Sequence, residues 1–232
     1  MKKIKHLFFD LDRTLWDFEK NSHNELNHLF RKYKLHQKGI SLPNEFIKIY
    51  KKVNEDCWER YRNNKLTKEK LRKERFDLTL SFFGINDADL ASRIGNAYVA
   101  NSPYRTDLVL GTIDLLEKLF PKYKMHIITN GFEEVQHVKL EQSNLVKYFD
   151  KVITSEAAGA KKPSKLIFDY ALNKSGALIE ESIMIGDDLN TDIQGALNIG
   201  MKNIYFNPHQ KEHKFNVWQE VVKLSDIKNI LL

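Results

Sequence analysis

The segment FFDLDRTL, residues 8–15, carries the most informative pattern in this chain. An apolar run, residues 6–10, ends on Asp10, and a second acid, Asp12, follows two positions later. A short apolar run of this kind predicts a buried strand. Two carboxylates at the mouth of one strand repel each other, a cost that an ordinary turn does not require. We therefore expect a functional site where this strand ends.

The second part of the chain alternates between strand-like and helix-like segments. Short apolar runs predict strands at residues 124–129, 151–154, 182–186 and 203–206. Helical spacing predicts helices between them, at residues 131–143, 164–174 and 189–199. This alternation is typical of βαβ units and a parallel sheet. The strand at residues 6–10 belongs to the same sheet, since one strand cannot form a sheet alone.

Residues 16–95 differ from the rest of the chain in composition and periodicity. They are rich in Lys and Glu, and their apolar residues recur at helical spacing over residues 26–33, 46–58 and 71–83, with Thr67 as a candidate N-cap of the third helix. The expected fold is therefore α/β, with a Rossmann-like parallel core formed by residues 1–15 and 96–232. Residues 16–95 are expected to form an inserted helical domain.

Composition narrows the functional classes. The net charge of +6 lies almost entirely within residues 16–95, where the basic residues alternate with acids, which argues against a nucleic-acid surface. A single cysteine, Cys57, excludes a disulfide scaffold and a Cys-rich zinc site. The first apolar run is too short for a signal peptide, and no stretch is long enough to span a membrane. We expect a cytoplasmic protein with neither nucleic-acid nor membrane partners.

Polar residues follow the predicted strands in a consistent way. Ligands of open parallel sheets bind beyond the carboxyl ends of the strands, so these side chains should gather at one edge. Singly, each has an ordinary interpretation as a turn residue, helix cap or solvated side chain; together they favour a site that needs a cation. An all-oxygen site of this kind suits Mg²⁺. The candidates are Asp10, Asp12, Thr129, Asn130, Lys162, Asp187, Asp188 and Asp192.

The order of these residues resembles the four motifs of the haloacid dehalogenase superfamily. The motifs stand here as DLDRT at residues 10–14, IITNG at residues 127–131, GAKKP at residues 159–163 and IGDDLNTD at residues 185–192. The helical insertion is similar to the C1-type cap of that superfamily. The resemblance thus extends over the whole chain.

The resemblance implies a catalytic mechanism. Asp10 would be the nucleophile that forms an aspartyl-phosphate, and Asp12 the general acid and base. Thr129 would bind a phosphoryl oxygen, together with Asn130. Lys162 would neutralise charge; its neighbour Lys161 is a rival that the Lys-Pro pattern disfavours.

The resemblance also implies a Mg²⁺ cofactor. Asp10, the backbone carbonyl of Asp12, and Asp187 would hold it, with Asp192 or Asp188 helping through water. Because Asp187 and Asp188 are adjacent, which of them is the direct ligand stays open, although the position after Gly186 favours Asp187.

Asp12 also bears on the reaction. A halide leaving group needs no proton, whereas an alkoxide does, so an acid here favours a phosphatase over a dehalogenase. Residues 12–22 are similar to the superfamily branch of pyrimidine 5′-nucleotidases. Trp16 could stack on a base, or it could anchor the insertion to the core. Arg13 could point away or meet substrate.

The expected function is that of a Mg²⁺-dependent 5′-nucleotidase acting on a small phosphorylated metabolite, a nucleoside monophosphate. A broad sugar-phosphate or phosphoglycolate phosphatase is the first alternative, with a phosphomutase or a dehalogenase less favoured. A non-enzymatic regulator that carries a phosphoryl group on Asp10 is an alternative from another class. The expected oligomeric state is a monomer or a homodimer.

Overall fold

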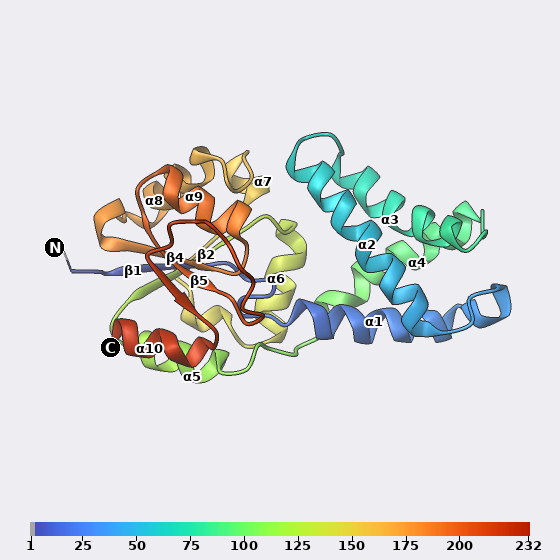
Figure 1. Ribbon diagram of the computed structural model, residues 1–232, viewed down its shortest axis with the longest axis horizontal. Helices are drawn as coiled ribbons and strands as arrows, with labels where there is room; N and C mark the ends of the chain where they lie inside the picture. Colours follow the sequence, from blue (N-terminus) through green and yellow to red (C-terminus); the bar gives the residue numbers. More distant parts are fainter. Residues whose placement is uncertain (1–2) are drawn as a thin grey trace. The chain divides into compact units, whose positions relative to one another are not determined.

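The computed structural model describes residues 3–232, which form two compact units. The core unit takes the chain up to Phe18 and again from Thr106, and the helical unit is Glu19–Arg105 (Figure 1). The boundaries expected from the sequence, at residues 15/16 and 95/96, stay a prediction. Residue 95 falls inside helix α4 (Ala88–Asn101).

A parallel sheet forms the centre of the core unit, which confirms the predicted fold class. Its six strands lie in the order β3-β2-β1-β4-β5-β6, and every neighbouring pair is parallel. The predicted strands are all present, although β5 begins one residue earlier and β6 was not expected. The strands are β1 (His6–Phe9), β2 (Lys124–Thr129), β3 (Lys151–Thr154), β4 (Ser182–Gly186), β5 (Lys202–Phe206) and β6 (Gln219–Val221).

Both faces of this sheet are apolar and covered by helices, as a parallel sheet requires. Successive side chains of a strand point to opposite faces, so Leu7 and Phe9 of β1 join one apolar cluster and Phe8 joins the other. The first cluster includes side chains of α5 (Thr112–Leu119), α6 (Glu133–Gln142) and α10 (Ile227–Leu231). The second includes side chains of α8 (Lys165–Ser175) and α9 (Gln194–Asn198).

The helices α6 and α8 match the predicted ones to within about two residues. The segment predicted as one helix at residues 189–199 is divided into a π-helical turn, η5 (Leu189–Ile193), and α9. Within the described part of the core unit, three helices were not predicted: α5, α10 and the short α7 (Ser155–Ala158). Short 3-10 turns complete the connections: η1 (Leu35–Lys38), η2 (Ser102–Tyr104), η3 (Val146–Tyr148), η4 (Ile179–Glu181) and η6 (Leu224–Asp226).

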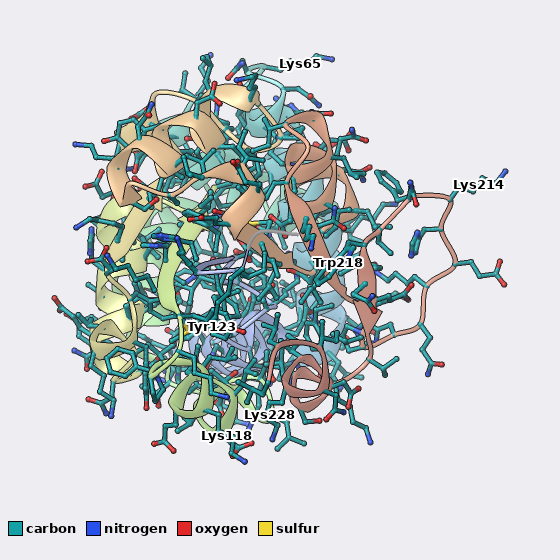
Figure 2. The ribbon with its side chains drawn as sticks, turned by 90° about the vertical axis from the view of Figure 1, so that its left-hand side faces the viewer. Lys65, Lys118, Tyr123, Lys214, Trp218 and Lys228 are labelled. Atoms are coloured by element: carbon teal, nitrogen blue, oxygen red, sulfur yellow. The ribbon has the colours of Figure 1, made fainter. Side chains whose placement is uncertain are left out.

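An ion pair connects α5 to α10 at the surface of the core unit. Asp114 accepts a hydrogen bond from Lys228 Nζ at 2.5 Å and lies 3.3 Å from Lys118 Nζ. Figure 2 shows both lysines at this edge, with Tyr123 nearby. The Tyr123 hydroxyl donates to the backbone oxygen of Leu231, 2.5 Å away, which fixes the end of α10.

The helical unit contains four long helices and, within Glu19–Arg105, no strand. Three of them were predicted from apolar spacing, and Thr67 caps the third, accepting a hydrogen bond from the backbone N–H of Lys70 at 3.3 Å. The fourth was missed. The unit has an apolar cluster of its own. Its helices are α1 (Phe18–Lys32), α2 (Pro43–Arg62), α3 (Lys68–Phe82) and α4.

Across residues 3–232, no helix has the length and apolar character needed to cross a bilayer.

Candidate active site

The carboxyl ends of three central strands bring the candidate residues together. Phe9, the last residue of β1, pairs with Ile127 of β2 and with Ile185 of β4. This register places Asp10 and Asp187, which follow β1 and β4, at the same edge as Thr129 at the end of β2. The strands are short and wholly buried at these ends, so the edge is rigidly placed.

Lys162 lies at the centre of this edge. Its Nζ donates hydrogen bonds to Asp10 Oδ1 at 2.6 Å and to the backbone oxygen of Ile128 at 2.8 Å, and it pairs with Asp192 Oδ1 at 2.6 Å. All three ammonium hydrogens therefore have acceptors. The side chain is 2% exposed. Burial alone would lower the pKa of Lys162, but the two carboxylates outweigh burial and raise it above its ordinary value.

Asn130 fixes the backbone of Lys162. Asn130 Oδ1 accepts a hydrogen bond from the Lys162 backbone N–H at 2.8 Å, and Asn130 Nδ2 donates to the Lys162 carbonyl at 3.1 Å. The end of β2 is thereby joined to the loop before α8. The expected role of Asn130 in substrate binding stays a prediction; in the structure its amide places Lys162, the lysine that reaches Asp10.

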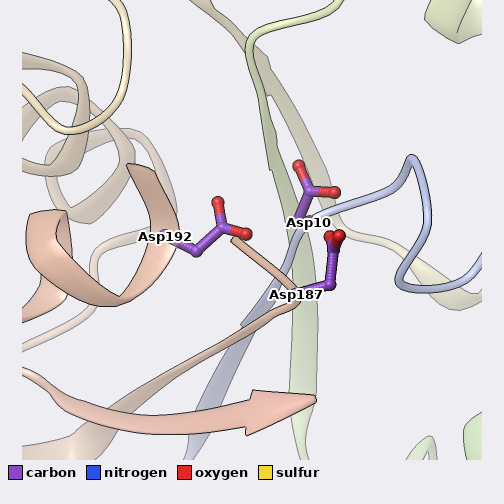
Figure 3. A group of neighbouring side chains, drawn as sticks. All are labelled: Asp10, Asp187 and Asp192. Carbon is purple, nitrogen blue, oxygen red and sulfur yellow. The ribbon is translucent and has the colours of Figure 1, made fainter. Parts of the chain in front are cut away.

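Three carboxylates gather beside Lys162. Oxygen atoms of Asp10, Asp187 and Asp192 lie within 4.8 Å of one another. Figure 3 shows the three side chains converging from β1, from the end of β4 and from the helical segment after it. Burial raises the pKa of Asp187 to about 7 and also raises the pKa values of Asp10 and Asp192 above their ordinary values. One lysine cannot balance three carboxylates, so the oxygen donor set fits a divalent cation such as Mg²⁺.

The structure distinguishes the two adjacent acids. Asp187 is one of the three clustered acids, and its Oδ1 accepts a hydrogen bond from Thr14 Oγ1 at 3.0 Å. Asp188 Oδ1 instead accepts from the backbone N–H groups of Asn190 and Thr191, at 2.8 Å and 3.1 Å, and so caps η5. This arrangement favours Asp187 as the residue that faces a cation.

Gly186 is needed for the approach of Asp192. A Cβ atom added at Gly186 would lie 2.2 Å from Asp192 Oδ2, which no side chain could tolerate without displacing that carboxylate. A glycine is therefore required at the end of β4 on steric grounds, which the sequence pattern alone did not show.

Asp12 is held by a different element. Lys139 Nζ donates to Asp12 Oδ1 at 2.5 Å, and Gln136 Nε2 donates to Asp12 Oδ2 at 2.8 Å, both from α6. Sequence reasoning missed both partners, because they lie in no motif. Their spacing of three residues puts them on one face of α6, but only the packed position of that helix directs the face toward Asp12.

Three further candidates have defined surroundings. Thr129 Oγ1 accepts a hydrogen bond from the backbone N–H of Gly131 at 3.0 Å, which leaves its hydroxyl hydrogen able to donate. Trp16 was expected to stack on a base or to serve as an anchor; its ring is buried in the core unit, and Lys139 Nζ lies 4.2 Å from the ring centroid. The Arg13 guanidinium lies over the Phe18 ring, 4.6 Å from its centroid.

With this geometry in place, comparison with known proteins decides the family. Residues 7–206 match the model of the haloacid dehalogenase-like hydrolase family. The chain belongs to this family. It is therefore a hydrolase, as the four motifs predicted.

Characterised relatives and solved structures agree with this assignment. The chain is 33% identical over 207 residues to the pyrimidine 5′-nucleotidase YjjG of Escherichia coli, covering 89% of this chain and 87% of the relative. It is 30% identical to a glyceraldehyde 3-phosphate phosphatase of Methanothermobacter thermautotrophicus, over 98% of each chain. The magnesium-bound crystal structure of the HAD hydrolase YfnB of Bacillus subtilis superposes with a TM-score of 0.88, at 28% identity over 99% of each chain.

Proposed function

We propose that this protein hydrolyses phosphate monoesters, with Asp10 as the nucleophile and Asp12 as the general acid and base. The observation that carries the proposal is the buried contact of Lys162 with Asp10 and Asp192, beside Asp187. An ammonium group among carboxylates at a strand edge suits a phosphoryl group, whose negative charge must be offset during transfer.

In the first step, one carboxylate oxygen of Asp10 attacks phosphorus and the bond to the ester oxygen breaks. Lys162 occupies Oδ1 of Asp10, so Oδ2 is the oxygen available for attack. Asp12 donates its proton to the departing alkoxide, and the products are a free alcohol and an aspartyl-phosphate on Asp10. The hydroxyl of Thr129 binds a phosphoryl oxygen.

In the second step, water attacks the phosphorus of the aspartyl-phosphate. Asp12, now a carboxylate, accepts the proton of this water as the bond from phosphorus to Asp10 breaks. Inorganic phosphate leaves, Asp10 is restored as a carboxylate, and Asp12 is again protonated. Two aspartates thus serve both halves of the reaction.

Asp10 and Asp187, with the backbone carbonyl of Asp12, are the residues we assign to a Mg²⁺ ion, with Asp192 assisting. When bound, the ion would screen the carboxylates from one another and stabilise negative charge on the transferring phosphoryl group. The raised pKa values of these acids support this assignment, because burial and the neighbouring carboxylates both disfavour the ionised forms, which a bound cation would stabilise.

The proposed substrate is a pyrimidine nucleoside 5′-monophosphate. Two observations support it: the segment at residues 12–22 and the likeness to YjjG over 89% of this chain. A panel of nucleoside monophosphates and sugar phosphates, assayed for released phosphate, tests it. We expect dUMP, dTMP and UMP to be hydrolysed with the highest kcat/KM. Turnover of these no faster than a generic aryl phosphate would reject the nucleotidase assignment.

A second candidate substrate class is the sugar phosphates. The likeness to a glyceraldehyde 3-phosphate phosphatase, which extends over 98% of this chain, is the observation that favours it. The same panel separates the two classes. A phosphomutase would release no inorganic phosphate in this panel and would be recognised by analysing the sugar phosphates for an isomerised product.

A further inference from the structure

The face of α6 that meets Asp12 is built from two buried side chains. Gln136 and Lys139 are three residues apart and so lie on the same side of the helix. They are 1% and 5% exposed, respectively. Each donates to a different oxygen of the Asp12 carboxylate, at 2.8 Å and 2.5 Å. The carboxylate is therefore held at both oxygens by one rigid element.

Lys139 is not an ordinary surface lysine. Its ammonium group is buried, and its charge is balanced by Asp12 and by the face of the Trp16 ring, 4.2 Å from Nζ. A buried ammonium group is costly unless it has such partners. Lys139 consequently has little freedom to move, and neither has the carboxylate that it binds.

Gln136 approaches Asp12 through space that Gly131 leaves open. A Cβ atom added at Gly131 would lie 1.5 Å from Gln136 Nε2. The glycine that follows β2 therefore admits the amide to its position against Asp12. The position of Gln136 against Asp12 thus depends on the short connection between β2 and α6.

This arrangement leaves one side of Asp12 accessible. Its side chain is 23% exposed, and each carboxylate oxygen has a second lone pair that the α6 contacts do not use. We propose that Lys139 and Gln136 are positioning residues that orient Asp12 for proton transfer to the leaving group. This inference rests on the proposed hydrolysis through Asp10 and Asp12. The carboxylate partner of both Gln136 and Lys139 is Asp12, not Asp10, Asp187 or Asp192.

The test compares two esters that differ in their need for a proton. A nucleoside 5′-monophosphate has an alkoxide leaving group that must be protonated, whereas p-nitrophenyl phosphate releases a stable phenolate that need not be. The measured quantity is kcat/KM, which reports the steps up to departure of the leaving group. In Lys139→Met, we expect kcat/KM to fall about tenfold to a hundredfold for the nucleotide and to stay within about threefold for the aryl ester.

Lys147→Met is the matched control. Lys147 also lies over an aromatic ring, 4.9 Å from the centroid of Tyr148, but it is exposed and does not contact Asp12. This variant should leave both kcat/KM values unchanged. Gln136→Leu and Gln142→Leu form a second matched pair on α6, since Gln142 is exposed; the first should show the same ester-dependent loss, more weakly, and the second none.

The outcomes are distinguishable. Equal losses on the two esters, or no loss on either, would overturn the positioning role. A gain on the nucleotide would also overturn it, because it would mean that α6 holds Asp12 away from its working position. If Lys139→Met fails to fold, Gln136→Leu gives the same comparison. Failure of the proposed function would instead appear in the unsubstituted protein, as absent hydrolysis of both esters.

Discussion

At Lys162, a single ammonium group donates to two carboxylates and a backbone carbonyl on a side chain that is almost completely buried. Removing one partner from a buried ion pair costs roughly 3–5 kcal/mol, because the other charge is left without compensation. Lys162 therefore has two roles: it stabilises the ionised form of Asp10 and it keeps Asp192 in place. Lys161, one residue earlier, does not make these contacts: the ammonium group that bonds to Asp10 and Asp192 belongs to Lys162.

Asp187 provides a pH-dependent prediction. Burial raises its pKa to about 7, so this carboxyl is protonated below that pH in the metal-free protein, and a cation must displace the proton. We expect the half-saturating Mg²⁺ concentration to rise roughly tenfold for each pH unit below about 7 and to level off above it. Activity measured against Mg²⁺ concentration at several pH values checks this. A half-saturating concentration that is the same at about pH 6 and about pH 8 would contradict it.

At the scale of elements, the site depends on how strand ends are joined to the segments after them. Asn130 links the end of β2 to the loop before α8, and Asp188 caps η5, which carries Asp192. Neither Asn130 nor Asp188 belongs to the cluster of Asp10, Asp187 and Asp192. Both determine where the residues of that group lie.

Asn130→Ala tests this link. Loss of both hydrogen bonds to the Lys162 backbone should allow Lys162 to shift, and we expect kcat to fall about tenfold or more while the protein stays folded. Asn173→Ala, at an exposed position of α8, is the control and should retain full activity. The measurements are kcat and the thermal unfolding midpoint of each variant. Unchanged kcat in Asn130→Ala would show that the loop before α8 is held by other contacts.

The elements that could be predicted are those with a strong apolar pattern. β1, β2 and β4 each contain a short run rich in apolar residues and are buried at every position except the first of β2, so the apolar pattern indicates strands. β6 is a three-residue strand with two exposed positions, and its sequence has no such pattern. The division of residues 189–199 into η5 and α9 follows from packing, because the helical periodicity is continuous there.

The site residues likewise fall into those whose position the sequence could predict and those whose contacts it could not. The position of Asp10, Thr129 and Asp187 at one edge could be predicted, because each ends a strand or directly follows one, and parallel strands end at one edge. Lys139 and Thr14 could not be assigned partners, since their contacts depend on where α6 and the turn after β1 lie in three dimensions. The sequence likewise could not show that Asp188 caps η5 whereas Asp187 lies beside Asp10 and Asp192.

At the scale of the whole molecule, the core unit buries two apolar clusters, one on each face of its sheet, and the helical unit buries one of its own. The core unit also buries a histidine pair at the end of the sheet opposite the site: His6 Nδ1 and His126 Nε2 are 3.0 Å apart. Burial lowers the pKa of His126 to about 4 and lowers that of His6 as well. The folded protein therefore binds fewer protons here than the unfolded chain does.

This difference predicts how stability varies with pH. The contribution of His126 is fully present above its ordinary pKa of 6.5 and is lost as the pH falls toward about 4. It amounts to about 3 kcal/mol at most. In His126→Phe, the free energy of unfolding should fall less steeply over this range than in the unsubstituted protein. His209→Gln, at an exposed site, should not change the slope. Equal slopes in His126→Phe and the unsubstituted protein would contradict the assignment.

The phosphoryl group on Asp10 is the most direct test of the proposed mechanism. In Asp12→Asn, an aryl phosphate should still phosphorylate Asp10, because its leaving group needs no proton. Hydrolysis of the resulting aspartyl-phosphate should be slow, because the general base Asp12 is missing. With a radiolabelled phosphoryl group and an acid quench, we expect a hydroxylamine-sensitive label on the peptide that contains Asp10. The label should be absent from the double variant that carries both Asp12→Asn and Asp10→Asn. A label on another residue, or turnover by Asp12→Asn at the rate of the unsubstituted protein, would contradict the mechanism.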